Sequence, residues 1–317
     1  MSALSAAGAV PLAVVDRSGF PESQHLGAAV VVSPDGSVVS KRGDVDSQIY
    51  PRSALKPFQT VAALRAGVVL DAPGMSIVTS SHAGTRRHVD AVHAVLASIG
   101  ASEGDLRTPE AWPSSRTAGN ELVRAGLGPS RIAMNCSGNH AGMIGAALAL
   151  GIPVADYLDP ANRVHGLADE VLREFAGASP DHPGTDGCGG PVWAVPLVAL
   201  ARGYANLFAA HPELGSAILA NPVLIDGEGG DTTRAIETLG VVAKVGAEGV
   251  WCAVAPNGSA VAVKVLDGSP RAAAAVGVGL LAAAGAVDGD AAAAFLADPA
   301  FSIPGGGHEV GRIRPLA

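Results

Sequence analysis

Apolar residues recur every three or four positions between residues 86 and 99. Val89, Val92, Val95, Leu96 and Ile99 therefore share one face, and this spacing predicts an amphipathic helix with one buried side. Further helices are predicted at residues 213–220, 232–239, 271–286 and 291–296.

Alternating apolar residues predict strands in two regions. Residues 27–39 contain two valine-rich runs around a Pro-Asp-Gly turn, the pattern of a β-hairpin. Strands are also predicted at residues 241–245, 249–255 and 260–266, with a Pro-Asn-Gly hairpin turn between the last two. Lys264 leaves the final strand on the face opposite its valines, so it points either into a confined site or into solvent.

Three polar clusters stand directly before predicted helices. Residues 79–84 follow a strand predicted at 75–78, and residues 135–143 follow one predicted at 132–134 and lead into a helix of small residues. Residues 185–191 precede a helix predicted at 192–200. Such loops hold catalytic side chains or cap helices, and the residues alone leave both alternatives open.

The composition describes a folded protein that does not bind nucleic acid. Of 317 residues, 48% are hydrophobic and 16% charged, which argues against disorder. The net charge of −8, without any cluster of more than two adjacent Lys or Arg residues, excludes a nucleic-acid binder. Small molecules and further copies of the chain are the expected partners.

The composition also bears on location. The longest uncharged apolar run, residues 272–287, is shorter than the ~20 residues that a membrane span needs. The apolar amino terminus lacks the basic residues of a secretory signal. Three cysteines, an odd number, suit a reducing compartment better than a disulfide framework. We therefore expect a cytoplasmic protein that neither spans nor binds a membrane.

A Ser-x-x-Lys motif provides the first chemical hypothesis. Pro51 and the apolar run after Lys56 predict a helix that places Ser53 and Lys56 on one face. A serine hydroxyl becomes nucleophilic when a neutral amine takes its proton, and a second nearby cation lowers the pKa of a lysine. The motif thus predicts another cation in the same pocket. The alternative is a helix cap beside a solvated lysine.

Four motifs in order resemble those of one family. They are Arg-Ser-x-x-Lys-Pro-x-Gln from Arg52, Ser-His-x-Gly from Ser81, Asn-Cys-Ser-Gly-x-His-Ala-Gly-Met from Asn135, and Asp-Gly-Cys-Gly-x-Pro from Asp186. They resemble the asparaginase II family, the thermolabile or rhizobial type of L-asparaginase. The likeness extends from Glu22 to the end of the chain.

The resemblance implies a fold class and an activity. The fold would be α/β, similar to serine β-lactamases and glutaminases, with a mixed sheet flanked by helices in a single catalytic domain over residues 1–317. The activity would be hydrolysis of L-asparagine by a homodimer. The family's two serine–lysine pairs correspond here to Ser53 with Lys56 and Ser81 with Lys264.

Roles follow from the same resemblance. Ser53 would attack the side-chain amide after Lys56 takes its proton, and Ser81 with Lys264 would relay a proton to ammonia. Arg52 would bind the substrate's α-carboxylate as a two-pronged donor. The other substrate-binding candidates are Asp186 and Glu22 for the α-ammonium group, and His82, His140 and Asn139 in the motif segments.

The resemblance also implies zinc, held by Cys136, Cys188 and a lysine. Here Asn139 occupies the lysine position, and an amide oxygen is a harder, weaker zinc ligand than an amine. Zinc on the two cysteines, with water or His140 completing the site, stays open. The alternative is two buried thiols that act as small apolar side chains.

Two other functions remain open. The first is an amidase acting on glutamine, a β-lactam or an aspartyl amide, since Lys244-Val245-Gly246 is similar to the Lys-Thr-Gly strand of penicillin-recognising enzymes. The missing Ser-Asp-Asn motif and export signal argue against a β-lactamase. The second is a catalytically silent amino-acid-binding protein, which the retained serines and lysines argue against.

Overall fold

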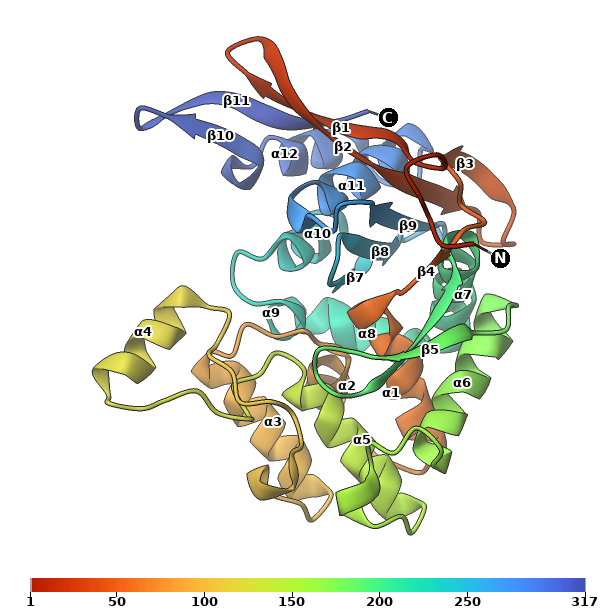
Figure 1. Ribbon diagram of the computed structural model, residues 1–317, viewed down its shortest axis with the longest axis vertical. Coiled ribbons are helices and arrows are strands. Elements are labelled where there is room, and N and C mark those ends of the chain that lie inside the picture. Colours follow the sequence, from red (N-terminus) through yellow and green to blue (C-terminus); the bar gives the residue numbers. More distant parts are fainter. Residues whose placement is uncertain (1, 317) are drawn as a thin grey trace.

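An antiparallel sheet runs across the upper part of the molecule (Figure 1). The computed structural model describes residues 2–316, and its main sheet has the order β10-β11-β1-β2-β9-β8-β7, with β3 paired to β2. Its strands are β1 (Val10–Arg17), β2 (Phe20–Val32), β3 (Val38–Arg42), β7 (Val242–Gly246), β8 (Val250–Val254), β9 (Ala260–Val265), β10 (Ser302–Gly305) and β11 (His308–Pro315).

Helices cover both faces of this sheet. α7 (Leu197–Ala210) and α11 (Ala273–Ala283) both pack against β9. Every residue of β8 is buried, and so is every residue of β9 except Lys264. Alanine and valine dominate both strands, and small or β-branched side chains let helices approach a sheet from either side. α10 (Asp231–Leu239) and α12 (Gly289–Leu296) pack beside α11.

A largely helical region lies below the sheet in Figure 1 and has its own hydrophobic cluster. It contains α1 (Lys56–Arg65), α2 (Ala72–Thr79), α3 (Arg86–Ser98), α4 (Arg116–Arg124), α5 (Ser137–Ala149), α6 (Arg163–Ala176), α8 (Pro212–Ala220) and α9 (Pro222–Ile225). A second sheet has the order β4-β6-β5 and consists of β4 (Gln48–Ile49), β5 (Asp181–Thr185) and β6 (Pro191–Pro196). Its strand β4 precedes α1 in the chain.

Most predicted elements are present. The helix over 86–99 is α3, the 27–39 hairpin is β2–β3, and the three strands over 241–266 are β7, β8 and β9. The helices predicted at 213–220, 232–239, 271–286 and 291–296 correspond to α8, α10, α11 and α12. The α/β class with a helix-flanked sheet is confirmed, but the expected mixed sheet is antiparallel in all its named strand pairs, as is the second sheet.

Three element predictions were wrong. Residues 75–78 lie in helix α2, because Asp71 caps its first turn by accepting a hydrogen bond from Gly74 N. Residues 132–134 form a turn, not a strand. The helix predicted at 192–200 begins only at Leu197, because β6 first pairs with β4 and β5. Within residues 2–316, the helices are too short or too polar to cross a membrane.

Candidate active site

The Ser-x-x-Lys segment enters α1 through a tight turn. Arg52–Leu55 is a 3₁₀ helix, and Lys56 is the first residue of α1. Arg52 has φ +55°, a left-handed conformation that costs energy for any residue but glycine and is often found at functional sites. Ser53 and Lys56 are both buried and line one narrow cavity. Their pairing as nucleophile and base stays a prediction.

Lys56 lies at the centre of a hydrogen-bond network. Its amine nitrogen is 2.5 Å from Ser80 O, 3.0 Å from Ser81 Oγ and 3.1 Å from Cys136 Sγ. An ammonium group has three N–H donors, and here each finds an acceptor.

Ser81 is paired with Lys244, so the predicted pair with Lys264 is wrong. Lys244 Nζ lies 2.8 Å from Ser81 Oγ, which places the hydroxyl between two amines. β7, which carries Lys244, packs against the Arg52–Leu55 turn, whereas β9 lies two strands further into the sheet. Lys264 on β9 donates instead to the backbone carbonyls of Glu248 and Val265.

The surroundings of Lys244 make it a base. Complete burial, and then the neighbouring Lys56, hold the pKa of Lys244 well below its ordinary value. Its nitrogen has a second partner, Val245 O at 2.7 Å. A neutral amine that donates to this carbonyl keeps its lone pair for the proton of Ser81. A second lysine is therefore present, as the Ser-x-x-Lys motif predicted, but Lys244 is the lysine whose pKa is lowered.

Arg52 and Asp186 form an ion pair at the same cavity. Arg52 Nε donates to Asp186 Oδ1 at 2.8 Å, and Arg52 Nη2 lies 2.6 Å from the same oxygen. Both residues line the cavity beside Ser53. A guanidinium next to a carboxylate matches the opposite charges of an amino acid's α-carboxylate and α-ammonium groups.

Three predicted substrate-binding residues have other contacts. Glu22 pairs with Arg17 on the exposed β1–β2 hairpin. His82, completely buried, accepts from Gly84 N and donates to Ser137 Oγ. His140 receives a hydrogen bond from the Tyr157 hydroxyl at 2.6 Å, and burial lowers its pKa to about 3. The structure therefore gives these side chains contacts within the protein.

The two cysteines lie together, as predicted, but the zinc donor set is short. A hydrogen bond from Cys188, and the adjacent Lys56, lower the pKa of Cys136 to about 5. Asn139 lines the same cavity and donates to Val78 O at 3.2 Å. Among residues 2–316, no group of three His, Cys, Asp or Glu side chains is placed to hold a metal. Catalytic zinc sites use three protein ligands, so these residues do not fit one.

Lys244 is a candidate functional residue that the motif analysis missed. The signal was present: Lys244-Val245-Gly246 is similar to a Lys-Thr-Gly strand, and in penicillin-recognising enzymes this strand accompanies Ser-x-x-Lys. Lys244 and Lys264 both lie on predicted strands, and the residue pattern alone did not show which of them pairs with Ser81.

A sequence model of the L-asparaginase II family matches residues 13–315. The chain belongs to this family. Membership in L-asparaginase II supports an amidohydrolase, and the order of the four motifs agrees with it. Among curated proteins, none matches the chain.

Two solved structures show a distant likeness. One is described as Mglu in its glutamate form: it is 12% identical, has a TM-score of 0.39, and the match covers 86% of this chain and 65% of that one. A second structure of Mglu is 12% identical, with a TM-score of 0.38 and coverage of 81% and 66%. The chain thus spans less than two thirds of the length of either structure.

Proposed function

We propose that the protein is an L-asparaginase, which hydrolyses L-asparagine to L-aspartate and ammonia with Ser53 as its nucleophile. The observation that carries the proposal is the position of Ser81 between Lys56 and Lys244, next to a cavity that holds Ser53 and the Arg52–Asp186 pair. Ser81 and its two lysines transfer protons in this proposal. The Arg52–Asp186 pair matches the two charges of a free amino acid. Family membership supports the same reaction.

Proton transfer begins with the lysines. Lys56 gives one proton to Ser81 Oγ, and the proton of Ser81 moves to Lys244, which is neutral before this step. Both transfers follow contacts of 3.0 Å or less. Lys56 is then a neutral amine with a free lone pair, and it takes the proton of Ser53. The relay explains why the site has two lysines.

Hydrolysis then proceeds in two stages. Ser53 Oγ bonds to the side-chain carbonyl carbon of asparagine, and the C–N bond breaks as Lys56 returns a proton to the departing ammonia. Water attacks the resulting ester, Lys56 takes a proton from that water, and Ser53 Oγ recovers a proton when aspartate leaves. The sum is one asparagine and one water converted to one aspartate and one ammonia.

Substrate orientation falls to the Arg52–Asp186 pair. Arg52 would bind the α-carboxylate with the N–H groups it does not use on Asp186, and Asp186 would accept from the α-ammonium with its second oxygen, Oδ2. The cavity beside Ser53 holds only about 10 Å³ of free space, room for about one water. Asparagine therefore needs the cavity walls to move apart on binding.

In this proposal the two cysteines hold no zinc ion, because Asn139 replaces the third ligand. Metal analysis of protein purified without chelators tests this directly, with Asn139→Lys as the matched variant. The expected result is no zinc in the wild type and zinc in the variant. One zinc per chain in the wild type would contradict the proposal. The homodimer stays a prediction, which sedimentation would test.

Ammonia release from a substrate panel tests the function. The panel contains L-asparagine, L-glutamine, an aspartyl amide and, by absorbance, a β-lactam, each with wild type and Ser53→Ala. The proposal predicts turnover of asparagine that the variant loses. Turnover of another panel member in place of asparagine would assign the site to a different amidase. No turnover of any would indicate a binding protein.

A further inference from the structure

Lys244 receives a proton in the proposed relay at a place that water does not reach. Its side chain is 1% exposed, and neither hydrogen-bond partner of its amine, Ser81 Oγ or Val245 O, is an anion. A buried ammonium group without an opposite charge is costly, because it has lost the water that stabilises it. The centre therefore needs an anion close to Lys244 whenever this lysine holds the proton.

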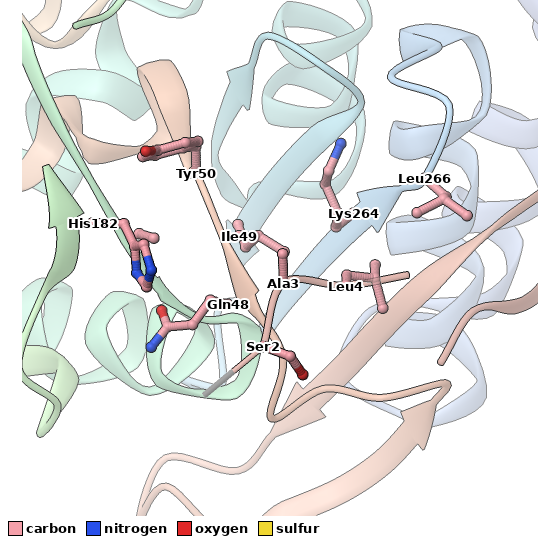
Figure 2. A pocket seen from close by; sticks show the side chains of 10 residues that line it. Ser2, Ala3, Leu4, Gln48, Ile49, Tyr50, His182, Lys264 and Leu266 are labelled. Carbon is pink, nitrogen blue, oxygen red and sulfur yellow. The ribbon is translucent and has the colours of Figure 1, made fainter. Parts of the chain in front are cut away.

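The lysine on β9 provides the contrast. Lys264 is partly exposed and lines a separate cavity of about 420 Å³ (Figure 2). Burial lowers the pKa of Lys264, and the carboxylates of Glu248 and Asp267 act in the opposite direction. Solvent and two acids thus support the charge of Lys264, whereas Lys244 depends on the protein alone.

Asp226 is placed to provide the anion at Lys244. It follows Ile225, whose carbonyl oxygen accepts a hydrogen bond from Ser81 N at 3.0 Å. On its other side, Gly227 packs so closely on Ala83 that a Cβ at Gly227 would lie 2.5 Å from Ala83 Cβ. Both neighbours of Asp226 therefore contact the segment 81–83, which carries the hydroxyl between the two lysines.

The carboxylate of Asp226 is held in place near β7. Its Oδ2 accepts a hydrogen bond from Thr232 N at 3.1 Å, in the first turn of α10. Gly230 leaves room for this oxygen, since a Cβ at that position would overlap it. α10 packs against β7, the strand of Lys244. These contacts fix the carboxylate close to the catalytic strand.

The charges of Asp226 and Lys244 act on each other. Burial and then Lys56 lower the pKa of Lys244, while Asp226 raises it. Burial raises the pKa of Asp226, and Lys244 is the strongest influence in the opposite direction. Other titratable groups also act on this pair: Cys136 and Cys252 on Lys244, and Arg234, Asp231 and His88 on Asp226.

We propose that Asp226 is the counter-ion of Lys244, a positioning residue that supports this lysine while it holds the proton of Ser81. The inference rests on the proposed relay and adds a residue to the same centre. No bond forms or breaks at Asp226, because its negative charge only offsets the ammonium group that the relay creates. Without it the proton would return to Ser81, and Lys56 would stay charged and unable to take the proton of Ser53.

Proton binding at Lys244 can be observed without substrate. The chain has four lysines, so protein labelled with carbon-13 at lysine Cε gives few signals, and Lys244→Met identifies the signal of Lys244. Asp226→Asn keeps the size of the side chain and an oxygen for Thr232 N but loses the charge. It should shift the titration of Lys244 to lower pH by about one unit. Glu228→Gln, the matched change at an exposed residue of the same loop, should leave the titration in place.

Kinetics test the consequence for catalysis. Asp226→Asn should lower kcat for asparagine about 10-fold, the equivalent of one pH unit in proton affinity. KM should stay nearly unchanged, because the Arg52–Asp186 pair is intact, and Glu228→Gln should match the wild type. A purely structural role of Asp226 would not shift the titration of Lys244.

The titration decides on Asp226 whether or not the protein is an asparaginase. An unshifted titration of Lys244 in Asp226→Asn would overturn the proposal. So would a shift without loss of kcat for whichever amide the wild type hydrolyses. Absence of turnover by the wild type would count against the asparaginase proposal alone. If Asp226→Asn does not fold, Asp226→Ala, with a smaller side chain, provides the same test.

Discussion

Lys244 and Lys264 stand on strands β7 and β9 of one sheet, with β8 between them, yet their surroundings differ completely. Lys244 is 1% exposed and its amine touches Ser81, in a centre where Lys56 and Ser81 also have partners. Lys264 is partly exposed, and its amine donates to the backbone carbonyl oxygens of Glu248 and Val265. The two lysines therefore have different partners, although both stand on strands of one sheet.

The difference teaches how burial and pairing decide the role of a lysine. A fully desolvated amine next to another cation loses its proton and becomes a base. Burial also lowers the pKa of Lys264, but the nearby carboxylates of Glu248 and Asp267 act in the opposite direction. Experiments can test the role of each lysine and its surroundings.

The largest effect is expected at the two serines. Ser53→Ala should lower kcat for asparagine about 10⁴-fold, because no acyl-enzyme can form. Ser81→Ala should lower it by a similar factor through loss of the relay. Mass spectrometry after reaction with a diazoketone analogue of asparagine separates their roles: Ser81→Ala should still be labelled slowly, at Ser53. Label on Ser81 in the wild type would reverse the assignment.

A smaller effect is expected for substrate orientation. Arg52→Lys should raise KM for asparagine about 10–100-fold and change kcat less, because an ammonium group lacks the planar fork that binds a carboxylate through two parallel hydrogen bonds. Asp186→Asn should act in the same direction. Glu22→Gln is the matched control, since Glu22 pairs with Arg17 on an exposed hairpin, and steady-state kinetics should find its KM unchanged. A larger effect at Glu22 than at Arg52 would contradict the site.

The smallest effect is one of stability. Lys244 has a depressed pKa, while a lysine in the unfolded chain binds a proton below about pH 10.4. Between these two pKa values the unfolded chain binds more protons, so the buried amine costs more stability as the pH falls. Lys244→Met should therefore raise Tm by a few degrees at pH 7, and the gain should shrink towards pH 10. Calorimetry at both pH values checks this, and a lower Tm at pH 7 would count against a neutral Lys244.

Local patterns predicted much of the fold. α3 followed from its 3–4 spacing, and the β8–β9 hairpin from its Pro-Asn-Gly turn, because both signals lie within one element. Residues 75–78 could not be assigned in this way, since four apolar residues fit a strand or a buried helix equally well. There the cap at Asp71 decided the outcome.

The candidate site was predictable where it depends on neighbouring residues. The placement of Ser53 and Lys56 on one side of the turn was predicted from their helical spacing. The proximity of Cys136 and Cys188 was predicted from the resemblance to the family motifs. The partner of Ser81 depends on which strand lies at the sheet edge beside the Arg52–Leu55 turn, a non-local fact.

The central claim is that Lys244, and not Lys264, completes the catalytic centre. Ammonia release from L-asparagine by Lys244→Met and Lys264→Met, the same substitution on two strands of one sheet, tests it most directly. The account predicts a loss of about 10³-fold in kcat for Lys244→Met and a change of at most a few-fold for Lys264→Met. Full activity of Lys244→Met together with loss of activity in Lys264→Met would contradict it.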